Sequence, residues 1–193
     1  MQHCSKMEMA KKIIIGVAGM PGAGKSLVVK AAYELGFKVV VMGDEVREEA
    51  KRRGIEATPE NLGRLMLELR EMEGPASIAK RCLEKIQKAK EDFVLVDGVR
   101  SMYEVEEFKK HFPNFILLAV HASPETRFRR LFKRRRSDDP VKWKNFVERD
   151  NRELKVGLGN VIALADYILV NEGGIEEFVE MTKQFLGNVA KNG

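Results

Sequence analysis

The chain has 193 residues, of which 44% are hydrophobic and 33% are charged. This length suits one domain, and the hydrophobic fraction excludes an intrinsically disordered chain. With 34 Lys and Arg against 29 Asp and Glu, the formal net charge is +5, which favours anionic partners such as nucleotides, nucleic acid or a membrane surface.

Residues 1–11 contain no apolar segment and are expected to form a flexible leader, followed by a single domain over residues 12–193. Cys4 and Cys82 lie far apart and fit no metal-ligand spacing, which favours a reducing compartment. No apolar run reaches the roughly 18 residues that a membrane span needs. We therefore expect a cytoplasmic protein with no membrane partner.

Five apolar, β-branched runs alternate with helical patterns along the chain. The runs are continuous rather than alternating in polarity, as strands buried on both faces of a parallel sheet are. The pattern predicts an α/β fold in which a doubly wound, five-stranded parallel sheet has helices on both faces. The expected strands are Ile13–Ala18, Val39–Met42, Phe93–Val96, Phe115–Val120 and Tyr167–Val170.

Short local signals mark the helix starts between these strands. Thr58-Pro59 and Ser123-Pro124 each place a capping side chain before a proline, which suits the first position of a helix. Ser101-x-x-Glu104 is a capping box. Gly74-Pro75 interrupts a helical insert over residues 44–90, which separates the second expected strand from the third.

The first expected strand runs directly into GMPGAGKS, the G-x-x-x-x-G-K-[ST] pattern of a Walker A loop. Its glycines let successive backbone N–H groups point inward, and the next helix directs its positive N-terminus to the same place. In such a loop Lys25 reaches the β- and γ-phosphates of ATP, and the Ser26 hydroxyl binds Mg²⁺. The predicted ATP-binding residues are Gly19, Met20, Pro21, Gly22, Ala23, Gly24, Lys25, Ser26 and Leu27.

Polar residues follow the second and third expected strands, at the sheet edge where this architecture binds ligands. Asp97 occupies a Walker B position, so we expect it to hold Mg²⁺ directly or through water; the alternative is an aspartate that begins a turn before Gly98. Arg47 and Arg100 could grip an anionic group from two sides, or each could be a solvated helix arginine.

With these motifs the chain resembles the nucleoside monophosphate kinases, especially adenylate kinase, and also dephospho-coenzyme A kinase. From residue 12 onward it is more closely similar to an archaeal family described as adenylate kinase-related, through MGDEVREEAKRRG, TPENLGRLMLELRE, DGVRSMYEVEEF and HASPETRFRRLFKR. The resemblance implies a P-loop NTPase fold of the adenylate kinase type. It also implies that the 44–90 insert binds the acceptor and that a short lid covers residues 134–150.

The adenylate kinase pattern also implies acceptor-binding residues. After the second strand of that enzyme come Thr-Gly-Asp and an arginine that holds the AMP phosphate; here Met42 replaces the threonine. After the third strand come Asp-Gly, a second AMP arginine and an adenine-reading glutamine. This chain has a glutamate there, in a version one residue shorter, and a glutamate accepts but cannot donate like an amide. The residues that the resemblance implies are Gly43, Arg47, Arg100 and Glu104.

Dephospho-coenzyme A kinase matches the chain elsewhere. Its last strand carries Ala-Asp followed by Asn-x-Gly, as residues 165–173 do here. The loop after that strand borders the ATP adenine in such kinases, so Asn171 is a further ATP-binding candidate. Asp44 matches an aspartate after the second strand. A hydroxyl acceptor needs a base, whereas a phosphate acceptor does not. Asp44 is therefore either that catalytic base or a residue that contacts the ligands of Mg²⁺ rather than the ion itself.

Seven cations and no acids fall within residues 127–136. The resemblance implies that Arg130 and Arg134, one helical turn apart, contact the adenine and phosphates of ATP. It likewise implies that Arg149 and Arg152 close over the transferring phosphoryl group and exclude water. We expect the other cations to form a solvated basic face, and Trp143 to lie in the core.

Together these features predict an ATP- and Mg²⁺-dependent kinase of a small nucleotide-like acceptor, with AMP or a related nucleoside monophosphate as the first choice. A dephospho-coenzyme A-like hydroxyl kinase is the neighbouring alternative. A regulatory ATPase or switch with little transferase activity is another, favoured by the departures at Met42 and Glu104. The basic run leaves nucleic acid as a second-choice partner, whose affinity would depend steeply on salt.

Overall fold

The computed structural model describes residues 12–136 and 139–192, so the predicted leader lies outside the described residues. Five parallel strands form one sheet in the order β2-β3-β1-β4-β5, which confirms the predicted α/β architecture. Met42, predicted as the last residue of the second strand, is instead the first residue of the helix that follows β2. The strands are β1 (Ile13–Ala18), β2 (Lys38–Val41), β3 (Phe93–Asp97), β4 (Phe115–His121) and β5 (Tyr167–Val170).

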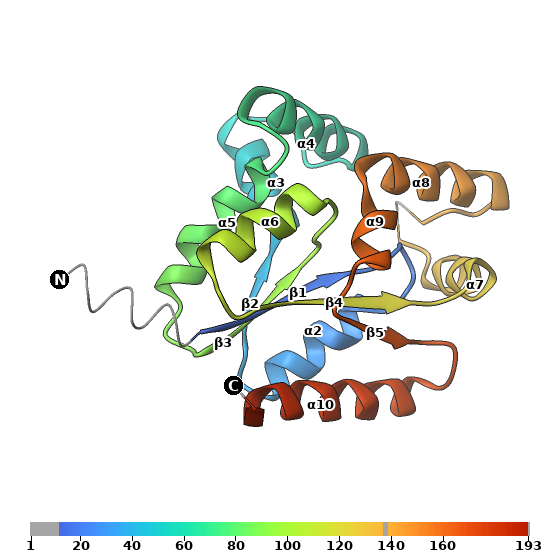
Figure 1. Cartoon of the computed structure of the whole chain (residues 1–193). Helices are drawn as coiled ribbons and strands as arrows, with labels where there is room; N and C mark the ends of the chain where they lie inside the picture. The colour runs from blue at the N-terminus through green and yellow to red at the C-terminus, as the bar shows by residue number, and fades with distance from the viewer. Residues whose placement is uncertain (1–11, 137–138, 193) are drawn as a thin grey trace.

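Helices cover both faces of the sheet (Figure 1). The α2 (Lys25–Glu34) and α10 (Ile175–Asn192) helices pack together on one face. The opposite face carries α3 (Met42–Arg52), α5 (Ser77–Lys88), α6 (Met102–His111) and α9 (Leu158–Ala163). Successive residues of β1 point to opposite faces, so Ile14 and Ala18 join one apolar core while Ile15 and Val17 join the other.

Of the remaining helices, α4 (Pro59–Glu73) lies in the predicted insert, α7 (Pro124–Arg134) ends where the predicted lid begins, and α8 (Trp143–Val156) starts within that lid. Figure 1 shows α7 and α8 beyond the arrowheads of the central strands, at the carboxyl edge of the sheet. Backbone N–H groups donate to the side chains of Thr58, Ser101 and Ser123, which confirms the three predicted helix starts. The α4 helix ends before Gly74, whose φ of 94° supplies the predicted break.

None of the helices in the described part of the chain combines the length and the apolar character needed to cross a bilayer.

Candidate active site

The Walker A loop lies between β1 and α2, as predicted. Gly24 caps α2 with a φ of 111°, and the helix begins at Lys25. The first-turn N–H groups of a helix have no intrahelical partner, so this end of α2 presents donors and a positive dipole to the loop. The Lys25 ammonium donates to the Gly19 carbonyl at 2.5 Å. The loop therefore has the local geometry of a phosphate cradle.

Asn171 and Arg130 support this loop through a chain of hydrogen bonds. The buried Asn171 amide donates to the Ala23 carbonyl at 2.8 Å, which connects the loop after β5 to the phosphate loop. Arg130 donates to the backbone and side-chain oxygens of Asn171 at 2.9 and 3.1 Å. A Cβ on Gly24 would collide with Asn171 Nδ2, so this contact requires glycine. The structure thus brings two predicted ATP-binding residues together beside the loop.

Arg127 connects the loop to α8, a role that the sequence did not reveal. Its guanidinium binds both carboxylate oxygens of Asp150 at 2.8 and 2.7 Å, donates to the Pro21 carbonyl at 3.3 Å and stacks on Phe146. Arg127 is 4% exposed. In the sequence it is one of seven neighbouring cations, and no local pattern distinguishes it from the solvated ones.

Charged groups from several segments converge on Lys25. Burial lowers the pKa of Lys25, the charges of Asp97 and Glu153 raise this pKa, and those of Arg100 and Arg149 lower it further. All four groups therefore lie within electrostatic reach of the ammonium. Glu153, on α8, was not predicted as a site residue.

Asp97 lies at the end of β3, beside β1. Its Oδ1 atom is buried and has no hydrogen-bond partner among the described residues. Burial raises the pKa of Asp97, the charges of Lys25 and Arg100 lower it, and the neighbouring Asp44 raises it. An orphaned, buried carboxylate oxygen next to the phosphate loop fits a divalent cation, which would supply the missing partner.

The predicted acceptor arginines already face carboxylates. Arg100 Nη1 lies 3.3 Å from Glu153 Oε2, a buried oxygen that makes no hydrogen bond within the described chain. Arg47 binds Asp44 within α3 through two nitrogens, and Arg47 Nε lies 3.0 Å from Asp44 Oδ1. The Arg47 guanidinium also lies next to Gly43. Both side chains of this second pair are about half exposed. Each of the two predicted acceptor arginines thus faces a carboxylate in the structure.

Glu104 differs from its predicted role. Its carboxylate is fully buried and accepts from the backbone N–H groups of Arg100 and Ser101 at 2.7 and 3.2 Å. The other oxygen accepts from Arg70 of α4 at 2.7 Å. The structure therefore uses Glu104 to cap α6 and to fasten α4, in place of the predicted contact with an acceptor base. The capping box in the sequence indicates this structural role.

In the lid region, Arg134 binds Asp139 through two nitrogens, at 2.9 and 2.6 Å. Arg149 Nη1 lies 3.6 Å from the same carboxylate, whose side chain is 2% exposed. Burial acts against ionisation, but the hydrogen bonds from Arg134 and the Arg136 backbone hold the pKa of Asp139 below its usual range. Two predicted catalytic arginines are therefore gathered on one internal carboxylate.

A cleft of about 600 Å³ separates α8 from the start of α4. Arg149 and Arg152 line it from the lid side, and Glu60 lines it from the insert. The two segments predicted to close on the substrates therefore face each other across this cleft.

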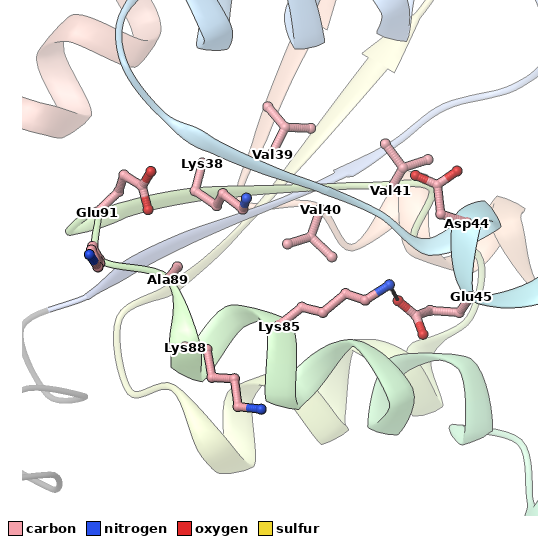
Figure 2. A pocket seen from close by; sticks show the side chains of 11 residues that line it. Lys38, Val39, Val40, Val41, Asp44, Glu45, Lys85, Lys88, Ala89 and Glu91 are labelled. Atoms are coloured by element: carbon pink, nitrogen blue, oxygen red, sulfur yellow. Dashed lines mark ion pairs between the residues drawn. The ribbon is translucent and has the colours of Figure 1, made fainter. Parts of the chain in front are cut away.

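A second hollow, of about 440 Å³, lies elsewhere, at the outer edge of β2 (Figure 2). The β2 strand and α5 form its walls, and Lys85 reaches across to Glu45 at 2.7 Å. Of the predicted site residues, Asp44 alone lines this hollow. This hollow lies at the sheet edge, apart from the phosphate loop.

The fold agrees with known structures. TT1252 from Thermus thermophilus superposes with a TM-score of 0.62 at 19% identity, over 92% of this chain and 97% of its own. A shikimate kinase from Acinetobacter baumannii, in complex with shikimate, gives a TM-score of 0.57 at 17% identity, over 97% and 98% of the two chains. Likeness at this level of identity shows the P-loop kinase type of fold.

Relatives of higher identity define the family. Residues 18–145 match the model of the AAA domain family. A UPF0200 protein of Hyperthermus butylicus is 52% identical over 97% of this chain and 100% of its own length. Another, from Methanothermobacter thermautotrophicus, is 46% identical over 94% and 93%. With its phosphate loop and five-stranded parallel sheet, the chain belongs to the UPF0200 protein family and has a fold of the P-loop kinase type.

Proposed function

We propose that this protein is an ATP- and Mg²⁺-dependent kinase that phosphorylates a small anionic acceptor, with AMP or a related nucleoside monophosphate as the first candidate. The observation that carries the proposal is the convergence of Lys25, Asp97 and Arg149 from the phosphate loop, β3 and α8. Phosphoryl transfer needs positioning and charge neutralisation rather than covalent catalysis by the protein. These groups supply both.

The nucleotide half of the site follows from the loop geometry. Backbone N–H groups of residues 19–26, other than Pro21, and the Lys25 ammonium bind the phosphates, with Arg130 and Asn171 beside them. Ser26 and Asp97 would hold Mg²⁺, which neutralises charge on the phosphate oxygens when it is bound. The orphaned Asp97 oxygen supports this assignment.

The lid arginines are proposed to stabilise the transferring group. Arg149 and Arg152 line the cleft, and Arg134 and Arg149 already share an anion, Asp139. Planar guanidinium groups match phosphoryl oxygens as they match a carboxylate. Replacing Asp139 by the γ-phosphoryl group would bring these arginines onto the reacting atoms and exclude water.

The acceptor half is proposed to centre on Arg100 and Arg47. Each guanidinium faces a carboxylate in the described structure, so an acceptor phosphate would take the place of Glu153 or Asp44. Because Glu104 is fully buried and bonded, base recognition would have to come from other residues. The proposal therefore concerns acceptors with a phosphate group and leaves the base open.

A hydroxyl acceptor of the dephospho-coenzyme A type is the second candidate. The observation that favours it is the pair of carboxylates, Asp44 and Glu153, on the acceptor side of Asp97 and Lys25. Either carboxylate could accept the hydroxyl proton as the oxygen attacks the γ-phosphorus. A phosphate acceptor needs no such base.

The test is a coupled assay of ADP release from Mg²⁺-ATP with separate acceptors: nucleoside monophosphates, then dephospho-coenzyme A. We expect saturable transfer to one acceptor class, with activity lost in Lys25→Ala and the acceptor KM raised in Arg100→Ala. Loss of activity in Asp44→Asn or Glu153→Gln with retained acceptor binding would favour the hydroxyl acceptor. ATP binding without transfer to any acceptor would instead favour a nucleotide-dependent switch.

A further inference from the structure

Two aromatic rings are exposed where α7 and α8 meet. Phe132 is 45% exposed and Trp143 is 48% exposed, whereas we expected Trp143 in the core. Both rings rest on Phe128, with ring centroids 6.1 and 5.2 Å away. The buried Phe146 supports Trp143 from beneath, with centroids 5.0 Å apart. The rings are therefore held in place from inside while part of each remains open to contact.

A cluster of partly exposed aromatic rings that is held in place from inside is a surface feature that marks an interaction site. Val147, which is 37% exposed, lies one helical turn after Trp143 on α8 and extends the same surface. We call this area, together with the cations described next, the aromatic–basic surface.

Cations flank the rings. Arg129 and Lys133 each follow a ring of α7 by one residue, and Lys142 and Lys144 stand on either side of Trp143. Over residues 12–136 and 139–192, none of the exposed cations in this area forms an ion pair with a carboxylate. Among the described residues, the exposed acids nearest in sequence are Glu125 and Glu148. The cations are Arg129, Lys133, Arg135, Arg136, Lys142 and Lys144.

The other cations of α7 already bind groups of the protein itself. Arg127 binds Asp150, Arg130 binds Asn171, and Arg134 binds Asp139. On α7 the aromatic–basic surface is formed by other residues, and it needs no contact with ATP. It therefore calls for a partner of its own.

We propose that the aromatic–basic surface binds single-stranded nucleic acid. A single strand offers unstacked bases to the two rings and phosphates to the flanking cations, which is the recognition mode of sequence-tolerant single-strand binders. A duplex keeps its bases stacked and would meet only the cations. A membrane surface would need a wider apolar face, and on α7 Leu131 is buried, which leaves Phe132 as the exposed apolar side chain of the helix.

The experiment uses Trp143, the only tryptophan of the chain, as its reporter. A single-stranded oligothymidylate is titrated into the full-length protein in saturating Mg²⁺-ATP, and tryptophan emission is followed. We expect saturable quenching by stacking, weaker binding of a duplex of equal length, and an affinity that falls with salt at roughly −0.7 per phosphate contacted. The same titration with single-stranded RNA shows whether the sugar matters.

Variants separate stacking from charge. By anisotropy of a labelled strand, Trp143→Ala should weaken binding roughly tenfold, while Trp143→Phe should keep most of the affinity. Lys133→Ala/Lys144→Ala should lower both the affinity and the salt slope. The matched control is Lys109→Ala/Lys110→Ala, two exposed lysines of α6, which should change neither. Lys25→Ala should also leave strand affinity intact, so this test is independent of the kinase proposal.

Three results would overturn the proposal. The first is the absence of strand binding at low salt by protein that is folded by circular dichroism. The second is equal affinity of wild type and Trp143→Ala, with inorganic polyphosphate competing as well as the strand, because charge alone would then explain the binding. The third is a blue shift of Trp143 emission with anionic phosphatidylserine vesicles and no response to the strand, which would make the surface a membrane contact.

Discussion

Individual residues of the phosphate loop have structural roles that the Walker A motif alone does not specify. Gly24 is the clearest case, because its φ of 111° and the close approach of Asn171 Nδ2 each exclude a Cβ at this position. Gly36 has a φ of 79°, and a Cβ there would meet nothing within 4 Å. Alanine at position 36 therefore tests backbone strain alone, whereas alanine at position 24 adds a collision with Asn171.

Gly24→Ala should abolish measurable ATP binding, because an alanine at a φ of 111° strains the backbone of the loop and its Cβ also displaces Asn171 from the Ala23 carbonyl. Gly36→Ala should lower the free energy of unfolding by about 1 kcal/mol and leave ATP affinity unchanged. Calorimetric titration with Mg²⁺-ATP and urea unfolding measure the two effects. Normal ATP affinity in Gly24→Ala would show that the Asn171 contact does not shape the loop.

Asn171→Ala tests the same contact from the other side. The substitution removes the hydrogen bond to Ala23 and deprives Arg130 of the side-chain oxygen that it binds. We expect ATP affinity to fall about tenfold, which corresponds to one hydrogen bond of about 1.4 kcal/mol. The exposed Asn160→Ala is the control and should bind ATP like wild type.

At the scale of elements, Glu104 joins two helices that are distant in sequence. It caps α6 through two backbone N–H groups and binds Arg70 of α4, whose Nε and Nη1 atoms are buried without hydrogen-bond partners among the described residues. Removing the carboxylate would leave a buried guanidinium with no anion. Such a loss is among the more costly changes in a protein interior.

Glu104→Ala should therefore lower the free energy of unfolding by about 3 kcal/mol, and Glu104→Gln by less, because an amide oxygen can still cap α6. Urea denaturation of both variants gives the comparison. The acceptor KM of folded Glu104→Gln should match wild type. A selective rise in that KM would return Glu104 to the acceptor site.

Glu49 fastens α3 to α5 and makes this part of the insert sensitive to acid. Its carboxylate is 2% exposed and binds Arg52, Arg53 and Arg81. The hydrogen bond from Arg52 is the main cause that lowers the pKa of Glu49 from 4.5 to about 2. A carboxyl group with a lowered pKa binds its proton less readily in the folded chain than in the unfolded one.

The stability from Glu49 should be complete above pH 4.5 and should be lost as the pH falls toward about 2. Glu49→Gln should lose about 2 kcal/mol at neutral pH and show a flatter decline in acid. Urea unfolding at a series of pH values measures this. An identical pH dependence in wild type and variant would contradict the assignment.

Local signals determined how well the elements could be predicted. The strands, the phosphate loop and the three capped helix starts depend on residues adjacent in sequence, so a pattern could identify them. The apolar pattern extends the second strand to Met42, and this residue is indeed buried, but it belongs to the first turn of α3. An apolar residue at a strand end does not show where the helix begins.

The missed parts of the site depend on contacts between distant segments. Arg127 and Asp150 are 23 residues apart, and Glu153 of α8 meets Arg100 although the two are 53 residues apart in sequence. Each of these residues also resembles an ordinary helix surface charge. The resemblance to adenylate kinase directed attention to Arg100 and Asp97, whose charges act on Lys25, but could not show that Glu104 is engaged by α6 and α4.

For the whole molecule, the positive charge is local. Without the seven cations of residues 127–136, the remaining 27 basic and 29 acidic residues would give a net charge of −2. Mg²⁺-ATP should thus be drawn toward α7 and the phosphate loop, where it also offsets the burial of Lys25. Binding to the folded state alone raises the stability of the entire domain.

At 100 times its dissociation constant, Mg²⁺-ATP should raise the free energy of unfolding by about 2.7 kcal/mol, and Tm by about 5–10 °C for a domain of this size. Lys25→Met should remove most of this shift while keeping the fold, since Met fills a similar volume. Scanning calorimetry with and without Mg²⁺-ATP provides the measurement. An equal shift in Lys25→Met would place the nucleotide elsewhere.

Asp139 provides the arginines of the proposed lid with an internal counter-ion. Because Arg134 and Arg149 both meet this carboxylate, nucleotide binding exchanges one ion pair for another rather than creating a pair from solvated charges. The net release of salt ions in that exchange is small, whereas the solvated cations around Trp143 would release theirs in full. The affinity for ATP should consequently be nearly indifferent to ionic strength under conditions that weaken strand binding severalfold.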